Sequence, residues 1–328
     1  MIKQIIIAAA AVLLLTGCGD NAGGGASSAG ADSASPAAEA SAVSGGEAAS
    51  LPEIKADTSA KTAMVSYLGP EGTYTQEACG VFFGGEGSYM PCETVGDAVD
   101  ALTKGGSSFA VIPQENTIGG AVTDYIDILI NSAGVSVVGE VELPINQNLL
   151  VLPGTKASDI KTVYSHKQGI AQGREWLEAN LPQAEVKEVS STAEGAKMVS
   201  EGGDSSCAAI ASAACAEVYG LDVLAAAIQN NDSNKTRFYV LSMQQPPTAA
   251  AARTAFIAEG SAAELPGLMT AMQEQGITLI ALHDRPKKTV LGEYQYVIEC
   301  AGCSYGQYIK LAEGTGLGMR FLGCFDVK

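Results

Sequence analysis

Short apolar runs alternate with stretches of helical spacing from residue 64 onward. An apolar run bounded by turn residues is typical of a buried strand, and apolar residues three or four positions apart are typical of a helix packed on a sheet. The predicted strands are residues 64–68, 109–113, 135–143, 148–152, 186–190, 207–213, 223–228 and 238–241. The first predicted helix follows the turn at residues 69–75 and ends near residue 83. The other predicted helices cover residues 95–103, 122–130, 169–178 and 192–200. This alternation predicts an α/β fold.

The alternation restarts after Pro144, which predicts a second lobe. We expect a domain over residues 63–245, with lobe 1 at about 63–144 and 225–245 and lobe 2 at about 145–224. Two crossings between lobes leave a cleft, which is where small ligands bind on such folds.

The pattern changes after the Gln244-Gln245-Pro246-Pro247 segment. Strands are predicted at 254–259, 278–285, 294–300 and 321–327, and helices at 263–275 and 307–312. This order is the βαββαβ of a ferredoxin-like domain, here over residues 252–328. It carries no catalytic constellation, so regulation or dimerisation is its expected role.

The first eighteen residues resemble a bacterial lipoprotein signal, with Lys3, the apolar stretch 5–15 and Leu15-Thr16-Gly17-Cys18. The resemblance implies export, cleavage before Cys18 and a lipid on its sulfur; a cysteine placed there by chance is the alternative. Residues 19–62 are mostly small, polar or acidic and predict a disordered linker. The mature protein would then be anchored to the bacterial membrane by lipid alone.

The net charge of −17 argues against a nucleic-acid or anionic-membrane surface. A site for an anion must then gather the few cations, and Lys167, Arg174 and Arg237 are the candidates. Besides Cys18 there are seven scattered cysteines. Cys300 and Cys303 have the spacing of a redox pair or of half a zinc site, but no second such pair accompanies them, so we favour structural cysteines and no metal.

Four polar segments carry the candidate chemistry. They are Gly69-Pro70-Glu71-Gly72-Thr73-Tyr74-Thr75, Gln114-Glu115-Asn116-Thr117-Ile118-Gly119-Gly120, Ser165-His166-Lys167-Gln168 and Asn234-Lys235-Thr236-Arg237-Phe238. Each stands where a predicted strand or helix begins or ends, which is where α/β folds place ligand contacts. Arg237 could bind a carboxylate, and Thr236 offers a donor and an acceptor. There are alternatives to a ligand-binding role. His166 could be structural, and helix capping could explain Thr73, Thr75, Asn116 and Thr117.

In this order the segments resemble prephenate dehydratase followed by an ACT regulatory domain, over residues 64–328; Leu322-Gly323-Cys324-Phe325 matches as well. The resemblance implies decarboxylation and dehydration of prephenate to phenylpyruvate by a lyase without a cofactor. It also implies lobes like those of type 2 periplasmic binding proteins and a homodimer or homotetramer.

The resemblance makes Thr236 the essential hydroxyl and Arg237 a carboxylate clamp or a residue that shapes the loop. The implied substrate-binding residues are Thr73, Thr75, Glu115, Asn116, Thr117, Ser165, Gln168 and Arg237. An L-phenylalanine effector would bind near Leu265, Asp284, Arg285 and Pro286.

Several residues depart from the family pattern: Gln114 replaces Ile, Thr117 replaces Ser, Lys167 replaces Pro and Asn230 replaces an acid. We expect Gln114 and Lys167 to place polar groups beside the cleft. His283 stands where the family has Glu before the Arg-Pro pair, which alters the expected phenylalanine site. Because the signal implies export, a rival hypothesis is a non-catalytic, membrane-tethered protein that binds or senses aromatic acids.

Overall fold

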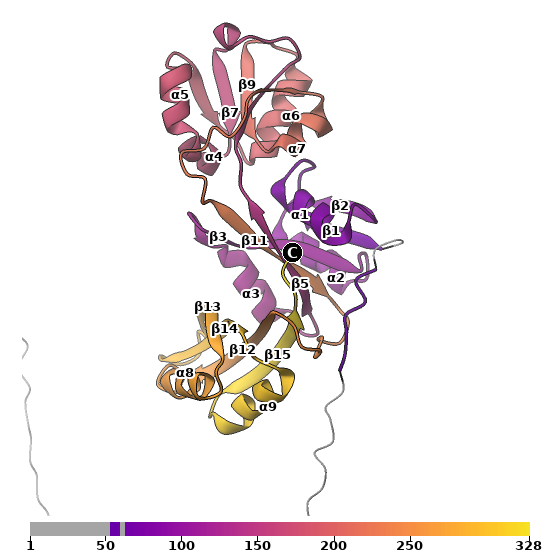
Figure 1. The fold of residues 1–328 in the computed structure, drawn as a ribbon, viewed down its shortest axis with the longest axis vertical. Helices are drawn as coiled ribbons and strands as arrows, with labels where there is room; N and C mark the ends of the chain where they lie inside the picture. The colour runs from indigo at the N-terminus through magenta and orange to yellow at the C-terminus, as the bar shows by residue number, and fades with distance from the viewer. Residues whose placement is uncertain (1–52, 60–62) are drawn as a thin grey trace, which may run out of the picture. The chain divides into compact units, whose positions relative to one another are not determined.

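The computed structural model describes residues 53–59 and 63–328, and they include the three β-sheets of Figure 1. The predicted signal peptide and most of the predicted linker lie outside the described residues. Part of that linker is structured, because the Ile54 amide donates to Thr248 Oγ1 at 2.8 Å and Gln244 Nε2 donates to the Asp57 carbonyl at 2.8 Å. Residues 53–59 therefore lie along the segment that follows the last strand of the first sheet.

The first sheet has strand order β2-β1-β3-β11-β5, with β4 paired to β3. Its strands are β1 (Met64–Leu68), β2 (Ser88–Cys92), β3 (Phe109–Asn116), β4 (Gly120–Ala121), β5 (Ser136–Pro144) and β11 (Lys235–Ser242). Its helices are α1 (Tyr74–Phe83), α2 (Val95–Thr103) and α3 (Thr123–Asn131). Apolar side chains of α1 pack on one face and those of α2 and α3 on the other, so β3 and β11 are buried on both faces.

The second sheet has strand order β10-β6-β9-β7-β8. Its strands are β6 (Asn148–Val151), β7 (Thr162–Ser165), β8 (Glu185–Glu188), β9 (Cys207–Ala211) and β10 (Asp222–Ala225). Its helices are α4 (Lys167–Gln172), α5 (Arg174–Asn180), α6 (Thr192–Gly202) and α7 (Ala213–Tyr219), with a 3₁₀ turn at Ala157–Asp159.

Two predictions in this region are wrong. The strand expected at 223–228 ends at Ala225, and Val223 is 43% exposed, because the chain turns there to cross between the sheets. The helix expected at 169–178 is two helices that meet at Gly173. A Cβ on Gly173 would lie 3.1 Å from the Ile210 side chain, so the chain passes close to β9 at this point.

Two segments cross between the first and second sheets and pair with each other. The Ile145 amide donates to the Asn234 carbonyl at 2.9 Å, and the Ile228 amide donates to the Gln147 carbonyl at 2.8 Å. The crossings join the ends of β5 and β11 to the second sheet, and this places the residues just before β11 at the junction.

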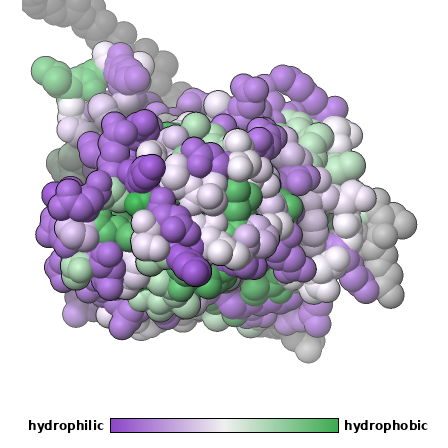
Figure 2. All heavy atoms as spheres, turned by 90° about the horizontal axis from the view of Figure 1, so that it is seen from above, coloured by the Kyte–Doolittle hydropathy of each residue, from purple (hydrophilic) through white to green (hydrophobic). Residues whose placement is uncertain are grey.

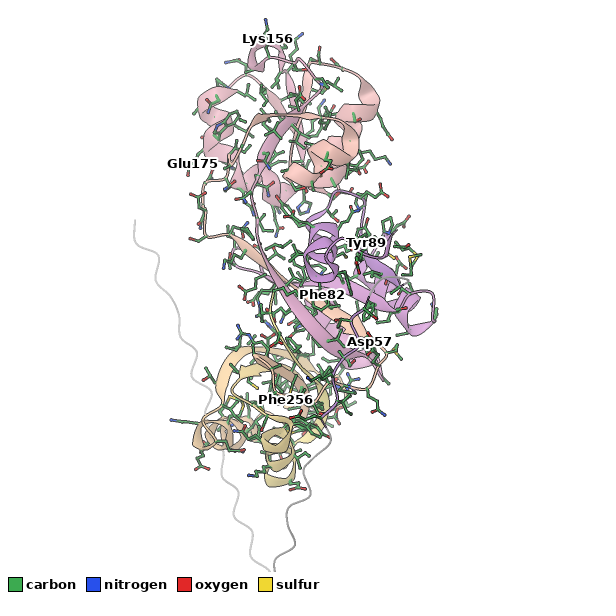
Figure 3. The ribbon with its side chains drawn as sticks, turned by 45° about the vertical axis from the view of Figure 1, so that its right-hand side comes forward. Asp57, Phe82, Tyr89, Lys156, Glu175 and Phe256 are labelled. Carbon is green, nitrogen blue, oxygen red and sulfur yellow. The ribbon has the colours of Figure 1, made fainter. Side chains whose placement is uncertain are left out.

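The third sheet is antiparallel, with strand order β13-β14-β12-β15. This sheet and its two helices form in the order β12 (Arg253–Ser261), α8 (Leu265–Glu274), β13 (Thr278–Pro286), β14 (Glu293–Ala301), α9 (Tyr305–Gly314) and β15 (Gly318–Phe325). This is the βαββαβ order of a ferredoxin-like unit. Phe256, labelled in Figure 3, lies in the core between this sheet and its two helices.

The other face of the third sheet shares a core with the first sheet. Ala255, Ile257, Val297 and Leu322 pack in one cluster with Tyr239 of β11 and with side chains of α2 and α3. After β15 the chain pairs with the edge of β5, where the Glu140 amide donates to the Asp326 carbonyl at 3.1 Å. The small unit is therefore held to β11 and β5 by apolar packing and by backbone hydrogen bonds.

Hydrophobic residues lie in small groups among hydrophilic ones on the face drawn in Figure 2. Within residues 53–59 and 63–328, no helix combines the length and apolarity needed to cross a bilayer. In the same residues, no group of three or more His, Cys, Asp or Glu side chains could hold a metal ion, and the seven cysteines after Cys18 are free thiols.

Candidate active site

A pocket of about 520 Å³ lies between the ends of β3 and β11 on one side and α4 and α6 on the other. This volume suits a small organic molecule. Hydroxyl and amide side chains line it together with one imidazole, and Leu68, Ile145 and Phe238 supply apolar surface. The sequence-predicted residues that line it are Thr73, Thr75, Asn116, Gln168 and Thr236. Five of the candidate site residues are thus brought to one cavity from both lobes.

Asn116 and Thr236 are neighbours on adjacent strands at the floor of this pocket. The Asn116 Nδ2 donates to Thr236 Oγ1 at 2.9 Å. The Asn116 Oδ1 accepts from the backbone amides of Ile118 at 3.0 Å and Gly119 at 2.8 Å. Because two backbone donors hold that oxygen, the amide nitrogen must face Thr236. Thr236 Oγ1 therefore accepts from Asn116, and its own proton is left to donate to a ligand.

The loop before β11 is fixed by Asn234, which is 1% exposed. Its Oδ1 accepts from Asn116 Nδ2 at 2.8 Å and from Thr117 Oγ1 at 3.2 Å. The Lys235 amide in turn donates to Thr117 Oγ1 at 3.0 Å. This side-chain network orders the loop that leads into β11 and so helps to fix the position of Thr236 at the start of that strand.

The opposite wall of the pocket comes from the start of α4. His166 caps this helix, since its Nδ1 accepts from the Gln168 amide at 3.3 Å, and the same side chain lines the pocket. The capping interpretation and the ligand-contact interpretation of His166 are both compatible with this position. A Cβ on Gly119 would lie only 2.7 Å from Gln168 Nε2, so the two lobes approach closely here. A larger residue at position 119 would require the Gln168 amide group to shift.

Within the described part of the chain, the side chains that line this pocket include no lysine or arginine. The predicted cations Lys167, Arg174 and Arg237 all lie elsewhere. The N-terminal turns of α1 and α6 do line it, through Thr73 to Thr75 and Ser191 to Thr192. First-turn amides have no partner within their helix and attract anions, so neutral donors take the place of fixed cations.

Four predicted substrate-binding residues do not line the pocket: Glu115, Thr117, Ser165 and Arg237. Ser165 is fully buried, and its hydroxyl donates to the Ile210 carbonyl at 2.7 Å. Thr117 holds the loop before β11, as described above. These four residues lie behind the side chains that line the pocket. The expectation that they contact a substrate directly is therefore corrected.

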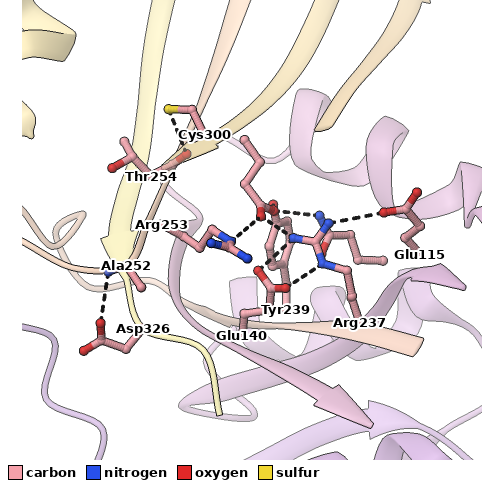
Figure 4. Close-up of polar contacts among 11 residues, drawn as sticks. Glu115, Glu140, Arg237, Tyr239, Ala252, Arg253, Thr254, Cys300 and Asp326 are labelled. Carbon is pink, nitrogen blue, oxygen red and sulfur yellow. Dashed lines mark hydrogen bonds and ion pairs between the residues drawn. The ribbon is translucent and has the colours of Figure 1, made fainter. Parts of the chain in front are cut away.

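Arg237 points away from the pocket because side chains alternate along a strand. Its Nε donates to Glu140 Oε1 at 2.6 Å, its Nη2 donates to Glu140 Oε2 at 3.0 Å, and its Nη1 donates to Glu115 Oε2 at 3.2 Å. A third carboxylate, Glu299 of β14, also accepts from Nη2. Arg253 Nε lies 3.3 Å from Glu299 Oε1. Figure 4 shows Arg237 between its carboxylate partners, so it is not a substrate clamp.

We call Glu115, Glu140, Arg237, Arg253 and Glu299 the interdomain charge cluster, since Arg253 and Glu299 belong to the βαββαβ unit. Glu140 is fully buried and Glu299 is 1% exposed. Burial raises the pKa of the Glu140 carboxyl to about 7; the charge of Glu299 adds to the rise, and Arg237 and Arg253 oppose it. Two arginines here face three carboxylates, so Glu140 can hold a proton near neutral pH.

The structure also shows where three of the residues that depart from the family pattern lie. Gln114 is 1% exposed and donates from Nε2 to Glu299 Oε2 at 2.9 Å, so it faces the charge cluster and not the cleft. Lys167 is exposed at the start of α4 and does not line the pocket. Asn230 lies beside the crossing, where its amide donates to the Gln172 carbonyl at 2.7 Å. The expected position of Gln114 beside the cleft is therefore wrong, whereas Lys167 stands between His166 and Gln168, which line the pocket.

The residues expected to bind an effector lie on α8 and β13 of the βαββαβ unit. Leu265 is the first residue of α8, while Asp284, Arg285 and Pro286 end β13. Arg285 Nε donates to Asp127 Oδ1 of α3 at 2.7 Å, across the boundary between the two parts of the chain. The structure thus gives Arg285 a contact that joins the small unit to lobe 1.

Sequence reasoning missed Glu140 and Glu299. Each is a carboxylate inside an apolar strand run, Val137 to Leu143 and Val297 to Cys300. A charge at such a position needs a buried partner, and this requirement is the signal that could have found them.

These features define a two-lobed α/β protein whose cleft is lined by hydroxyl and amide side chains, joined to a ferredoxin-like unit. A family model described as prephenate dehydratase matches residues 65–246. The bifunctional chorismate mutase/prephenate dehydratase of Neisseria gonorrhoeae is 37% identical over 240 residues, which cover 73% of this chain and 66% of that protein. This chain therefore matches slightly less than two thirds of that relative.

The prephenate dehydratase of Corynebacterium glutamicum is 33% identical over 249 residues, which cover 73% of this chain and 78% of that protein. The prephenate dehydratase structure from Arthrobacter aurescens, solved in complex with L-Phe, has a TM-score of 0.72 and 29% identity, and covers 80% of this chain and 90% of its own. The chain belongs to the prephenate dehydratase family, whose members are lyases.

Proposed function

We propose that this chain converts prephenate to phenylpyruvate, carbon dioxide and water, a step of phenylalanine biosynthesis. The observation that carries the proposal is the fixed orientation of Asn116, which leaves the Thr236 proton free to point into the pocket. Family membership supplies the substrate class.

The chemistry needs few groups from the protein. The bond from the ring to its carboxylate breaks, its electron pair enters the ring, and the carbon–oxygen bond of the ring hydroxyl breaks as the ring becomes aromatic. Thr236 would donate a hydrogen bond to the departing oxygen, which takes a proton from solvent and leaves as water. Aromatisation supplies the driving force, so positioning and preorganised donors are sufficient.

The substrate carries two carboxylates, and the pocket offers neutral donors for them. First-turn amides of α1 and α6, with the hydroxyls of Thr75 and Thr192, would hold these groups. His166 adds a ring nitrogen that can donate to one of them. A site without lysine or arginine binds the dianion less tightly than a cationic one would, and this avoids trapping the substrate before decarboxylation.

The test is turnover by the full chain. Prephenate should disappear with formation of phenylpyruvate, and Thr236→Val, which keeps the shape and removes the hydroxyl, should lower kcat by about 10²-fold or more. Binding of phenylpyruvate without any turnover by the wild-type chain would contradict the proposal and favour a non-catalytic aromatic-acid binder.

The βαββαβ unit is proposed to be an ACT regulatory domain. Its strand order and the similarity to a prephenate dehydratase solved in complex with L-Phe support this. L-phenylalanine is the effector to test, by its inhibition of turnover. The mass of the native protein in solution would test the predicted homodimer or homotetramer.

Lipid anchoring through Cys18 is likewise a proposal and rests on the signal-like sequence alone. Intact mass spectrometry of protein taken from membranes should show cleavage before Cys18 and a lipid-sized mass increment. A mature protein that retains its first residues, without lipid, would contradict anchoring.

A further inference from the structure

The two strands that carry Asn116 and Thr236 present different chemistry on their two sides. Thr236 is the register partner of Asn116, and both line the pocket. Arg237 is the register partner of Glu115, and both point to the interdomain charge cluster. One residue step along β11 therefore separates the proposed reacting hydroxyl from a contact with the βαββαβ unit.

The pairing of β3 with β11 is interrupted at this point. Arg237 pairs with Glu115, but the next residue, Phe238, pairs with Pro113, so Gln114 is left over as a bulge. Bulges bend strands and are frequent beside active sites, where they direct side chains to a new position. The ladder between β3 and β11 is thus offset at Gln114, while β11 keeps regular pairing with β5 from Lys235 to Val240. Side-chain contacts at the bulge therefore add to the backbone pairing that holds Asn116 and Thr236.

Glu299 of the βαββαβ unit supplies those contacts from the far side. It accepts from Arg237 Nη2 on β11, from Gln114 Nε2 at the bulge at 2.9 Å, and from the Tyr239 hydroxyl. Glu299 is 1% exposed, so each of these bonds forms away from water. A single carboxylate from the small unit therefore holds both strand ends on either side of the bulge.

We propose that Glu299 is a positioning residue for the reaction, because it holds Arg237 and Gln114 and thereby fixes Asn116 and Thr236 in the pocket. The inference rests on the proposed function and goes beyond it. It makes turnover depend on the docked βαββαβ unit and names the contact through which a ligand of that unit would act on the pocket.

The experiment compares Glu299→Gln with Asp127→Asn in the full chain. Glutamine keeps the shape of Glu299 and removes the charge that Arg237 shares. Asp127→Asn removes a second ion pair between lobe 1 and the small unit, at Arg285, where the Asp127 side chain is 60% exposed. We expect Glu299→Gln to lower kcat by about tenfold or more with KM nearly unchanged, and Asp127→Asn to leave both unchanged.

A double-variant cycle separates positioning from general destabilisation. Because Glu299 and Arg237 share one contact, Glu299→Gln combined with Arg237→Gln should lower kcat by less than the product of the two single losses. Additive losses, or equal losses in Glu299→Gln and Asp127→Asn, would overturn the inference.

A second variant serves if Glu299→Gln does not fold. Tyr239→Phe removes only one donor to Glu299 and should lower kcat by about threefold. An unchanged kcat in that variant would also overturn it.

Amide hydrogen exchange gives a readout that does not require activity. Exchange in residues 113–119 and 234–238 should become faster in Glu299→Gln and stay unchanged in Asp127→Asn. If the wild-type chain fails to turn over prephenate but exchange rises in this way, the proposed function fails and positioning holds. If the wild type is active while exchange and kcat of Glu299→Gln equal those of the wild type, the positioning inference fails alone.

Discussion

Replacing Asn116 by aspartate tests the hydrogen-bond direction on which the proposed reaction depends. The change keeps the size of the side chain and turns its donor nitrogen into an acceptor oxygen. The change removes the hydrogen bonds that Nδ2 donates to Asn234 Oδ1 at 2.8 Å, to the Lys235 carbonyl at 3.2 Å and to Thr236 Oγ1 at 2.9 Å. The Thr236 proton then donates to the new carboxylate and is withdrawn from the substrate.

The magnitude follows from these lost contacts. Loss of one preorganised donor lowers kcat by about 10²–10³-fold, or about 3–4 kcal/mol, and the new charge also repels a dianionic substrate. The two Nδ2 protons serve three acceptors, and Thr236 bonds again to the carboxylate, so the free energy of unfolding falls by about 2 kcal/mol, which should still leave a folded protein.

The assay is the rate of phenylpyruvate formation as a function of pH. Because a protonated aspartate can donate again, the activity of Asn116→Asp relative to wild type should rise as pH falls toward about 4. Asn131→Asp is the matched control: Asn131 is exposed on α3 and donates to the Asp127 carbonyl, outside the pocket, so the kcat of this variant should equal that of the wild type. An Asn116→Asp variant with kcat within about threefold of the wild type would refute the assigned donor direction.

Other substitutions test the buried charge and the packing of the first sheet. Glu140 has a folded-state pKa of about 7, above its value in the unfolded chain, so its contribution to stability is present at low pH and is lost as pH rises from about 4.5 to 7. Denaturant unfolding should show Glu140→Gln gaining about 3 kcal/mol relative to wild type over that range, and a constant difference would contradict the raised pKa. Gly139→Ala places a Cβ against the Phe82 ring and should cost about 1–3 kcal/mol, whereas Gly80→Ala on α1, with open space around it, should gain about 0.5–1 kcal/mol. Equal melting temperatures for these two variants would contradict the packing described.

The sequence predicted the meeting of Asn116 and Thr236, because both lie where a strand meets a polar loop and such ends gather at one edge of a sheet. It also predicted the βαββαβ order of the last part of the chain, since each of its elements has a clear apolar period.

The direction of Arg237 could not be predicted in the same way. Alternation along a strand places Thr236 and Arg237 on opposite sides, but it does not say which of the two faces the cleft. The partner of Arg237, Glu299, lies 62 residues further along the chain in another unit, and the bulge at Gln114 shifts the alternation again. Both features arise from packing between distant segments, which no local pattern records.

Ser165 shows the same limit for a buried hydroxyl. In the sequence it stands in a polar segment beside His166 and Gln168. In the structure it ends β7 facing inward and satisfies the Ile210 carbonyl, while its neighbours face the pocket. A hydroxyl can stabilise a backbone carbonyl or contact a ligand, and only the position of the neighbouring strand decides between these roles.

A crystal structure of the Thr236→Val variant with prephenate bound would show which side chain faces the leaving hydroxyl, because that variant should bind the substrate and not convert it. We expect the ring hydroxyl oxygen to lie near the substituted side chain at position 236, at about 3 Å from the place of the missing Oγ1, within the pocket lined by Asn116 and Gln168. Prephenate bound with that oxygen turned away from position 236, or bound outside this pocket, would contradict this expectation.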